Sequence, residues 1–381
     1  MYLSNICTNN CLYCGFRKDN KVLVRKILSR EEIILETESL LKEGHKRLLL
    51  LTGEYEETDV NYLIEAINTV YSVRVKNNYI RRINVEVPPM EVDDFVKIKK
   101  TKIGTYACFQ ETYDEVNYKK FHPSGKKSDY YYRLFAMDRA MAGGIDDVGL
   151  GVLFGLSNYK FEVISLLEHS RHLEETFGCG PHTISVPRIE PAENAPLSVN
   201  PPEKISNLEF KKIVAILRLA VPYTGLILST RESEELRNEL FNYGISQISA
   251  GSKTNPGAYS KKENNSTPQF SLGDHRSLEE VISALIDMEY IPSFCTGCYR
   301  KGRTGNDFMS LAKPGLIQSF CHPNAIFTFY EYLLDFTSPQ TKTKGEKLIE
   351  KLISQEQNPE LRKKIISILE EIKEGKRDIY L

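Results

Sequence analysis

Short apolar runs alternate with longer amphipathic stretches along the first two thirds of the chain. Eight of these runs are candidate strands, at 2–6, 46–51, 82–87, 103–109, 146–152, 182–187, 225–229 and 245–249. The stretches at 30–43, 57–76, 129–143, 158–175, 206–219 and 232–242 have apolar residues at helical spacing. Strands that alternate with helices predict βα units and a parallel sheet. Eight such units predict an α/β fold of the (β/α)8 TIM-type barrel class.

Polar residues follow these strand candidates at the end where the chain leaves them. The first run leads into a cysteine triplet, the second into Gly53 and Glu54, the fourth into Glu111, and the seventh into Arg231. In (β/α)8 barrels the carboxyl ends of the strands surround the active site. The pattern therefore predicts one site, built from many strands, at that end of the barrel.

The last part of the chain has a different pattern, and we expect two domains. Residues 1–290 would form the barrel, and residues 291–381 a mainly helical C-terminal domain. Within 340–381, apolar residues such as Leu348, Leu352, Ile365 and Leu369 have helical spacing. They predict two amphipathic helices that pack on the C-terminal domain or offer a surface to a partner protein.

Composition narrows the function classes. Of the 381 residues, 41% are apolar and 27% are charged, which predicts a sizeable folded core. The net charge of −1 gives no basic surface for nucleic acid. No apolar run has the length of a membrane span, and no signal peptide pattern opens the chain. We expect a cytoplasmic protein that binds neither nucleic acid nor membranes.

Six of the eight cysteines fall into two groups of three. Cys7, Cys11 and Cys14 form a Cys-x3-Cys-x2-Cys triplet, with Tyr13 just before the last cysteine. Thiolates select zinc or iron–sulfur clusters, and in a reducing compartment clustered cysteines favour metal binding over disulfides. Three thiolates leave one position of a four-ligand site open, either for a distant protein ligand or for a substrate.

The second group is Cys295, Cys298 and Cys321, in the pattern Cys-x2-Cys-x22-Cys. Two interpretations remain open. One is a structural zinc site completed by His322 or His275, and the other is a second iron–sulfur cluster with an open iron.

Several charged residues at the strand ends are candidates for ligand contacts. Gly53 would let the backbone approach a ligand, and Glu54 could accept hydrogen bonds from an ammonium group or cap a helix. An arginine can grip a carboxylate in a bidentate fork, which makes candidates of four arginines, each of which could instead form a structural ion pair: Arg133, Arg139, Arg188 and Arg231. Ser249 would lie beside Arg231, Glu111 and Tyr113 would face the cleft, and His182 is either a core histidine or a ligand.

Several segments of the chain have distinctive sequences. They include YLSNICTNNCLYCGF at 2–16, FQETY at 109–113, HTISVPRIEPA at 182–192 and SFCTGCYRKGRTG at 293–305. Together they resemble HydG, the radical S-adenosylmethionine (SAM) tyrosine lyase family of FeFe-hydrogenase maturation. The barrel stretches are shared with ThiH, the tyrosine lyase family of thiamine biosynthesis. The second cysteine group is a HydG feature that ThiH lacks.

The resemblance implies cofactors and site residues. The cofactors would be SAM and two 4Fe–4S clusters, held by Cys7, Cys11 and Cys14 and by Cys295, Cys298 and Cys321. His182 would hold an additional iron at the second cluster. The remaining residues would bind SAM (Tyr13, Gly53, Glu54, Arg133 and Arg139) or the substrate (Glu111, Tyr113, Arg188, Arg231 and Ser249).

The resemblance also implies an activity. A 5′-deoxyadenosyl radical from SAM would take a hydrogen from the amino group of L-tyrosine, and the Cα–Cβ bond would break to give p-cresol and dehydroglycine. Dehydroglycine would yield carbon monoxide and cyanide, which are captured on iron at the second cluster. Partners would include an electron donor such as ferredoxin or flavodoxin, and other hydrogenase maturation proteins. A ThiH-type lyase (2-iminoacetate synthase) and a non-catalytic iron–sulfur carrier remain alternatives.

Two features depart from the family pattern. The family has several tens of residues ahead of the cysteine loop, whereas here Met1 stands almost at the first strand candidate. Glu86, at the end of the third strand candidate, is unusual for the family.

Overall fold

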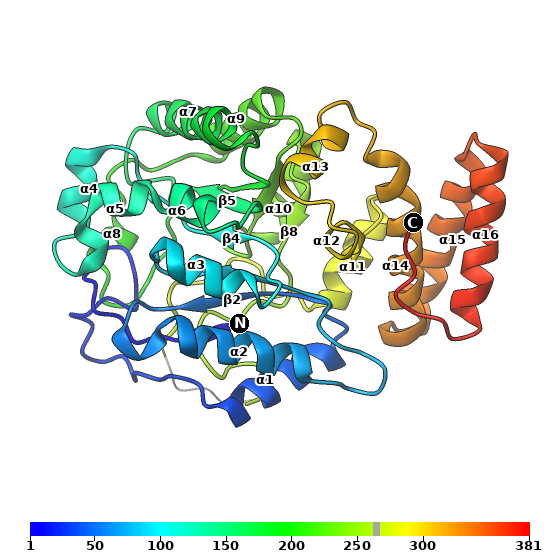
Figure 1. The fold of residues 1–381 in the computed structure, drawn as a ribbon, viewed down its shortest axis with the longest axis horizontal. Helices are drawn as coiled ribbons and strands as arrows, with labels where there is room; N and C mark the ends of the chain where they lie inside the picture. Colours follow the sequence, from blue (N-terminus) through cyan, green and yellow to red (C-terminus); the bar gives the residue numbers. More distant parts are fainter. Residues whose placement is uncertain (262–266) are drawn as a thin grey trace.

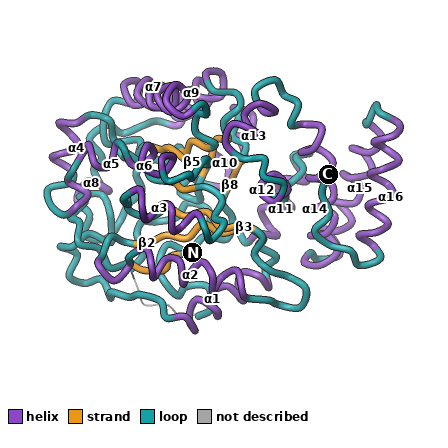
Figure 2. The backbone as a smooth tube through the Cα atoms, viewed as in Figure 1, coloured by secondary structure: helices purple, strands orange, loops and turns teal. Residues whose placement is uncertain are grey.

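Eight parallel strands form one sheet in the computed structural model, which describes residues 1–261 and 267–381. The strands are β1 (Tyr2–Ser4), β2 (Arg47–Thr52), β3 (Arg82–Glu86), β4 (Tyr106–Ala107), β5 (Val148–Gly151), β6 (Thr183–Ser185), β7 (Gly225–Leu228) and β8 (Gln247–Ile248). They pair in sequence order from β1 to β8, and helices surround them (Figures 1 and 2). The predicted (β/α)8-type α/β fold is confirmed; seven strands lie inside their predicted runs, and β2 extends one residue beyond its run, to Thr52.

Helices follow the strands and cover the outside of the sheet. Those of the barrel are α1 (Arg30–Lys42), α2 (Val60–Ser72), α3 (Val92–Lys99), α4 (Glu115–Phe121), α5 (Tyr130–Leu134), α6 (Ala136–Ala142), α7 (Tyr159–Phe177), α8 (Pro196–Val199), α9 (Asn207–Ala220) and α10 (Glu234–Leu240). Short 3-10 turns lie at Glu56–Thr58, Lys126–Ser128 and Phe241–Tyr243. The helix predicted over 129–143 is divided at Phe135 into α5 and α6.

Side chains alternate between the two faces of the strands, as pleating requires. In β2, Leu48 and Leu50 are buried in the core between sheet and helices, whereas Arg47, Leu49 and Leu51 line the interior of the curled sheet. Polar residues on these inward positions therefore surround a cavity instead of packing into the core.

The sheet is curled but not closed by strand pairing. Within the described part of the chain, no pairing joins β8 to β1. The segment after β8 spans the opening, because Gly15 N donates to Gln269 O and the Tyr2 hydroxyl donates to Gln269 Oε1, at 2.9 and 2.5 Å. On the outer side, the buried carboxylate of Glu36 accepts hydrogen bonds from the backbone of Tyr259 and Ser260.

The C-terminal helices have a hydrophobic core of their own. They are α11 (Leu278–Asp287), α12 (Gly297–Arg300), α13 (Gly305–Ala312), α14 (Gln318–Phe336), α15 (Pro339–Gln355) and α16 (Pro359–Lys373). The two predicted amphipathic helices correspond to α15 and α16, which lie beyond α14 at the far end of the molecule (Figure 1). The division into 1–290 and 291–381 stays a prediction, and the packing of α11 into this second core favours a division ahead of Leu278.

Among the helices that the structure describes, none combines the length and apolar character that a membrane crossing needs.

Candidate functional site

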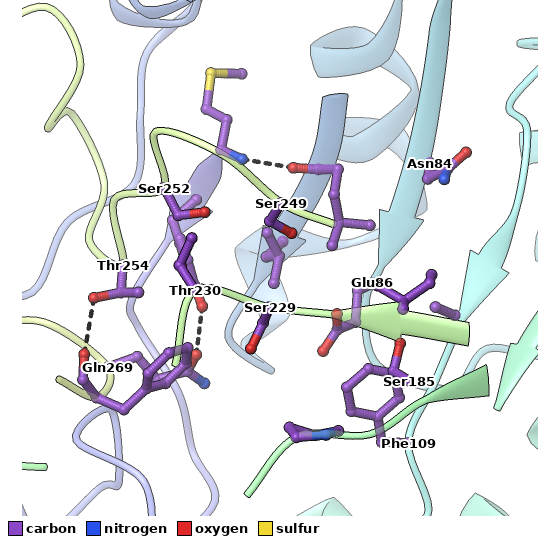
Figure 3. Close-up of a pocket in the computed structure, with 18 of the residues that line it drawn as sticks. Asn84, Glu86, Phe109, Ser185, Ser229, Thr230, Ser249, Ser252, Thr254 and Gln269 are labelled. Carbon is purple, nitrogen blue, oxygen red and sulfur yellow. Dashed lines mark hydrogen bonds between the residues drawn. The ribbon is translucent and has the colours of Figure 1, made fainter. Parts of the chain in front are cut away.

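One cavity of about 470 Å³ occupies the interior of the curled sheet. At the carboxyl ends of the strands it is lined by Cys7, Cys11 and Cys14. At the opposite end it is lined by Arg47, and by Ser293 and Phe294, which directly precede the second cysteine group. The close-up in Figure 3 shows polar residues of several strands around it, among them Glu86, Ser229 and Ser249. The two cysteine groups thus adjoin opposite ends of one space.

The loop that holds the first cysteine triplet is fixed by contacts from the second strand. Gly53 lies so close to this loop that an added Cβ would be 2.2 Å from Ile6 O. Glu54 accepts a hydrogen bond from Asn9 Nδ2 at 2.6 Å, and its backbone oxygen accepts one from Thr8 N at 2.9 Å. Gly53 therefore serves close packing of the cysteine loop, and Glu54 both orders that loop and lines the cavity.

Hydrogen-bond donors point at two of the three sulfurs. Asn9 Nδ2 lies 3.6 Å from Cys7 Sγ, while Phe16 N and Gln269 Nε2 each lie 3.4 Å from Cys14 Sγ. Burial raises the pKa of the Cys11 thiol to about 12. A thiol in such a place becomes a thiolate when a metal binds it, and N–H···S bonds stabilise that thiolate. The donor set therefore fits an iron–sulfur cluster.

The second cysteine group lies at the amino ends of the strands. Gly297 N donates to Cys295 Sγ at 3.3 Å, and Arg303 N donates to Cys298 O at 2.8 Å. Burial raises the pKa of all three thiols, that of Cys321 to about 11. The ring of Tyr380 packs on Gly297, since an added Cβ there would lie 3.0 Å from it. These contacts order the loop between Cys295 and Cys298 within the C-terminal part of the chain.

His182 lies beside this second group. It precedes β6, and its Nδ1 is 3.0 Å from Asp147 Oδ1 while its Nε2 is 3.1 Å from the hydroxyl of Tyr299. Tyr299 directly follows Cys298. A carboxylate on one ring nitrogen fixes the orientation of the imidazole, as is common for metal-binding histidines.

The described residues contain no ready-made site for a single metal ion. In residues 1–261 and 267–381, no three His, Cys, Asp or Glu side chains converge on one point. In a four-iron cluster each thiolate binds a separate iron, so the sulfurs stand further apart than the ligands of one ion.

The structure places the arginines predicted to bind carboxylates in different surroundings. Arg231 lines the cavity with its guanidinium 3.3 Å from the centre of the Phe270 ring, and no described carboxylate forms an ion pair with it. Arg188 instead makes a bidentate pair with Glu232 and donates to Ile205 O at 2.9 Å. Arg231 is therefore available to an anionic ligand, and Arg188 is engaged in holding the protein together.

Arg133 and Arg139 are also separated by the fold. Arg133 lines the cavity, donates to Phe109 O at 2.6 Å and lies 3.6 Å from Glu111 Oε1. Arg139 points elsewhere, donates to Met90 O at 2.9 Å and covers the ring of Tyr132. Arg133 can reach a ligand in the cavity, whereas Arg139 orders the α5–α6 region.

The two predicted cleft residues after β4 face opposite ways. Glu111, with a backbone φ of +70°, lines the cavity and is paired with Lys127 at 2.6 Å. Burial would raise the pKa of Glu111, but the charges of Lys127 and Arg133 hold it below its ordinary value. Tyr113 points away from the cavity toward α7, where its hydroxyl lies 2.8 Å from His169 Nδ1. The positive φ of Glu111 is a strained backbone conformation for a residue other than glycine, and such strain clusters at functional sites.

Tyr13 and Ser249 are the remaining predicted site residues. Tyr13 lines the cavity between Cys11 and Cys14, and its hydroxyl lies 2.7 Å from Nε2 of the buried His122. Ser249 follows β8 and also lines the cavity. Because no ligand contact tests them, the roles of all predicted site residues stay predictions.

Known proteins similar to this chain include enzymes and maturases. Residues 1–168 match the Radical SAM superfamily, and residues 185–291 match the Biotin and Thiamin Synthesis associated domain. A crystal structure of HydG, a maturase of the FeFe-hydrogenase, superposes with a TM-score of 0.96 and 49% identity, over 100% of this chain and 83% of that one. HydG from Carboxydothermus hydrogenoformans gives a TM-score of 0.85 and 43% identity, over 97% and 80%.

The chain belongs to the HydG family of radical SAM enzymes. The resemblance expected from the sequence is thereby confirmed. The 2-iminoacetate synthase of Salmonella typhimurium is 33% identical over 287 residues, which cover 75% of this chain and 73% of that enzyme. Membership in the HydG family implies SAM and a 4Fe–4S cluster as cofactors.

Some residues of this HydG-family site are not evident from the sequence. Lys127 pairs with Glu111, Gln269 contacts Cys14, and Arg47 reaches the cavity from the start of β2. Lys127 lies in the 3-10 turn Lys126–Ser128 and Gln269 lies in the loop after β8, where no spacing assigns either of them a role. Arg47 lies at the strand end opposite to the one where we expected the site. The alternation along β2 is the only sequence signal that could have placed Arg47 inside.

Proposed function

We propose that this protein is a radical SAM lyase that cleaves the Cα–Cβ bond of L-tyrosine to p-cresol and dehydroglycine. Dehydroglycine would then yield carbon monoxide and cyanide for an iron unit used in FeFe-hydrogenase assembly. The observation that supports this most is the single cavity, which extends from the first cysteine triplet to the residues next to the second. A continuous route inside the barrel suits reactive radicals and small products that would otherwise diffuse away.

At the first end, Cys7, Cys11 and Cys14 would hold the cluster that binds SAM. Bound there, this cluster would supply the electron that splits SAM into methionine and a 5′-deoxyadenosyl radical. Asn9 and Gln269 keep the cysteine sulfurs in place, and Glu54 and Arg133 offer opposite charges to the amino and carboxylate groups of SAM.

The tyrosine substrate would lie deeper in the cavity. No described carboxylate forms an ion pair with the Arg231 guanidinium, and Ser249 offers a hydroxyl beside the same space. We assign the substrate carboxylate to Arg231, because the alternative, Arg188, is already paired with Glu232. This arrangement keeps the substrate at the strand ends, next to the first triplet.

At the second end, Cys295, Cys298 and Cys321 would hold a second 4Fe–4S cluster. Asp147 orients the His182 ring, and His182 contacts Tyr299, the residue directly after Cys298. Both contacts support the proposal that His182 binds an additional iron at this cluster. The proposal also includes a ferredoxin or flavodoxin as electron donor.

The test is tyrosine cleavage by anaerobically reconstituted protein given dithionite, SAM and L-tyrosine. We expect 5′-deoxyadenosine and p-cresol from the wild type, and neither from Cys11→Ala, which removes one ligand of the first cluster. Deoxyadenosine without p-cresol would overturn the tyrosine assignment, and a lack of both products would favour a non-catalytic carrier.

A second candidate function is that of a ThiH-type 2-iminoacetate synthase, favoured by the 33% identity to the Salmonella typhimurium enzyme. Such an enzyme would cleave tyrosine without making carbon monoxide. The second cysteine group, and the cavity lining by Ser293 and Phe294 directly before it, favour the HydG-type activity, and carbon monoxide production distinguishes the two.

A further inference from the structure

Glu86 is a carboxyl group inside the cavity that the proposed chemistry has not used. It is the last residue of β3, and its side chain lines the same space as Ser229 and Ser249 (Figure 3). No protein group in the described part of the chain hydrogen bonds or ion-pairs with its carboxyl. Burial and the nearby negative charge of Glu111 raise the pKa of Glu86 to about 7.

Arg231 is the opposite charge that reaches the same space from the end of β7. It too has no ion-pair partner among the described residues, and Glu86 is one of the negative charges that act on it. An enclosed charge without a partner is unfavourable, so two such charges of opposite sign indicate a ligand that satisfies both. A ligand with one carboxylate and one ammonium group, an α-amino acid zwitterion, has this charge pattern.

We propose that Glu86 binds the ammonium group of the amino acid substrate and accepts a proton from it, while Arg231 holds the carboxylate. The inference rests on the proposed function and adds a substrate contact to it. In this step one N–H bond of the ammonium breaks and an O–H bond forms on Glu86, so a cation and an anion become two neutral groups and no electron moves. The neutral amine can then lose a hydrogen atom without leaving an aminium radical cation.

Glu190 is the competing carboxyl group in the cavity. It lies in the loop beyond β6, burial and Glu232 raise its pKa to about 7, and it too has no described partner. Two observations favour Glu86. Glu86 belongs to a strand and faces the interior, and it acts on Arg231 more strongly than Glu190 does.

The pH dependence of this step follows from the groups around Glu86. Charged and titratable groups from several elements interact electrostatically with Glu86. They are the N-terminal amino group and the side chains of Tyr2, Glu111, Lys127, Arg133 and Arg231. Glu86 accepts a proton only when ionised, and its pKa is about 7. Tyrosine cleavage should therefore fall as the pH drops through about 7, since the carboxyl is protonated below that value.

Glu86→Gln tests the proposal because it preserves shape and removes the ability to accept a proton. In the reconstituted, SAM-bound enzyme we would measure the Kd of L-tyrosine and of 3-(4-hydroxyphenyl)propanoate, which lacks the amine. We expect the variant to bind tyrosine about 10- to 100-fold more weakly, the range for a lost charged hydrogen bond, and to bind the amine-free acid as the wild type does. Its p-cresol formation should lose the rise near pH 7 and recover only at higher pH, where solvent deprotonates the amine.

Glu190→Gln is the matched control, and it should leave both the tyrosine Kd and the pH profile unchanged. Equal tyrosine affinity in Glu86→Gln and the wild type, or an effect seen only in Glu190→Gln, would overturn the proposal. The two claims have different readouts. If the proposed function is wrong, the wild type makes no p-cresol. If such a wild type still binds tyrosine more tightly than Glu86→Gln does, and binds the amine-free acid equally well, the zwitterion site is supported.

Discussion

At the scale of single residues, the difference between Arg231 and Arg188 determines how the substrate is held. Both follow a strand, and both are followed by an acidic residue within two positions. Glu232, the direct neighbour of Arg231 in sequence, nevertheless pairs with Arg188. The sequence alone could not separate the two, because the partner of each arginine is set by the curl of the sheet.

This difference leads to opposite expectations for two matched variants. Arg231→Gln should raise the KM for tyrosine and lower kcat/KM about 10- to 100-fold, as loss of a charged hydrogen bond does, with little change in Tm. Arg188→Gln leaves Glu232 unpaired and should lower Tm while KM stays close to that of the wild type. Steady-state kinetics and thermal unfolding of both variants check this, and a KM effect confined to Arg188→Gln would contradict it.

Gly53 gives a second expectation at this scale. A methyl group at this position would lie 2.2 Å from Ile6 O, so Gly53→Ala must displace the loop that holds Cys7. We expect lower iron and sulfide content, assigned to the first cluster by its spectrum with and without SAM. Gly180→Ala is the control, since the nearest atom to its added Cβ is 3.6 Å away. Full cluster content in Gly53→Ala would show that the loop tolerates the shift.

At the scale of elements, strands and cysteine loops were predictable to different degrees. The eight apolar runs located every strand, because each has the length and bounds of a buried strand. The opening between β8 and β1 was not predictable, since the residues that bridge it, such as Gln269 and Tyr259, belong to a loop without periodicity. Nor did any local pattern indicate that the second cysteine group would lie at the amino ends of the strands.

The segment after β8 is anchored by a buried charge network. Asp274, with 1% of its side chain exposed, pairs with Arg237 of α10 and with Arg276. Burial would raise the pKa of Asp274, but hydrogen bonds from Arg276 and the charge of Arg237 lower it to about 2. Its contribution to stability is therefore complete above its ordinary pKa of 3.8 and is lost as the pH falls toward 2.

Asp274→Ala removes the shared partner of these two arginines. We expect the free energy of unfolding to fall by about 3–5 kcal/mol at pH 7, the range for breaking a buried ion pair. Urea unfolding of wild type and variant at pH 7 measures the difference. Glu234→Ala is the control, because its pair with Arg276 lies at the surface, where about 0–1 kcal/mol is typical. Equal losses in the two variants would contradict the assigned burial.

Tyr380 connects the end of the described chain to the second cysteine group. Its ring lies on Gly297, between Cys295 and Cys298. The ring also lies 5.8 Å from the Arg300 guanidinium and 5.7 Å from Lys301 Nζ. Because a cation–π contact is worth about 0.5–1 kcal/mol, Tyr380→Ala should speed iron loss from the second cluster to a chelator about two- to fivefold. Tyrosine cleavage at the first cluster should stay unchanged. The exposed Tyr131 supplies the control variant, and equal rates of iron loss would exclude this role for Tyr380.

At the scale of the whole molecule, one cavity extends from the first cysteine group to the residues next to the second. The sequence predicted the fold class and both groups, and the family comparison agrees with that prediction. The curl of the sheet adds the spatial relation between them: inward residues of the strands line a route from Cys7, Cys11 and Cys14 to Ser293 and Phe294. This relation is what the proposed transfer of a product from one end to the other requires.

The most direct test of this account measures p-cresol and carbon monoxide in the same anaerobic vial. Wild type and Cys298→Ala would each receive dithionite, SAM and L-tyrosine, with carbon monoxide trapped on deoxyhaemoglobin. The account predicts both products from the wild type, and p-cresol without carbon monoxide from the variant. Carbon monoxide at wild-type yield from Cys298→Ala, or p-cresol alone from the wild type, would contradict the division of the reaction between the two ends of the cavity.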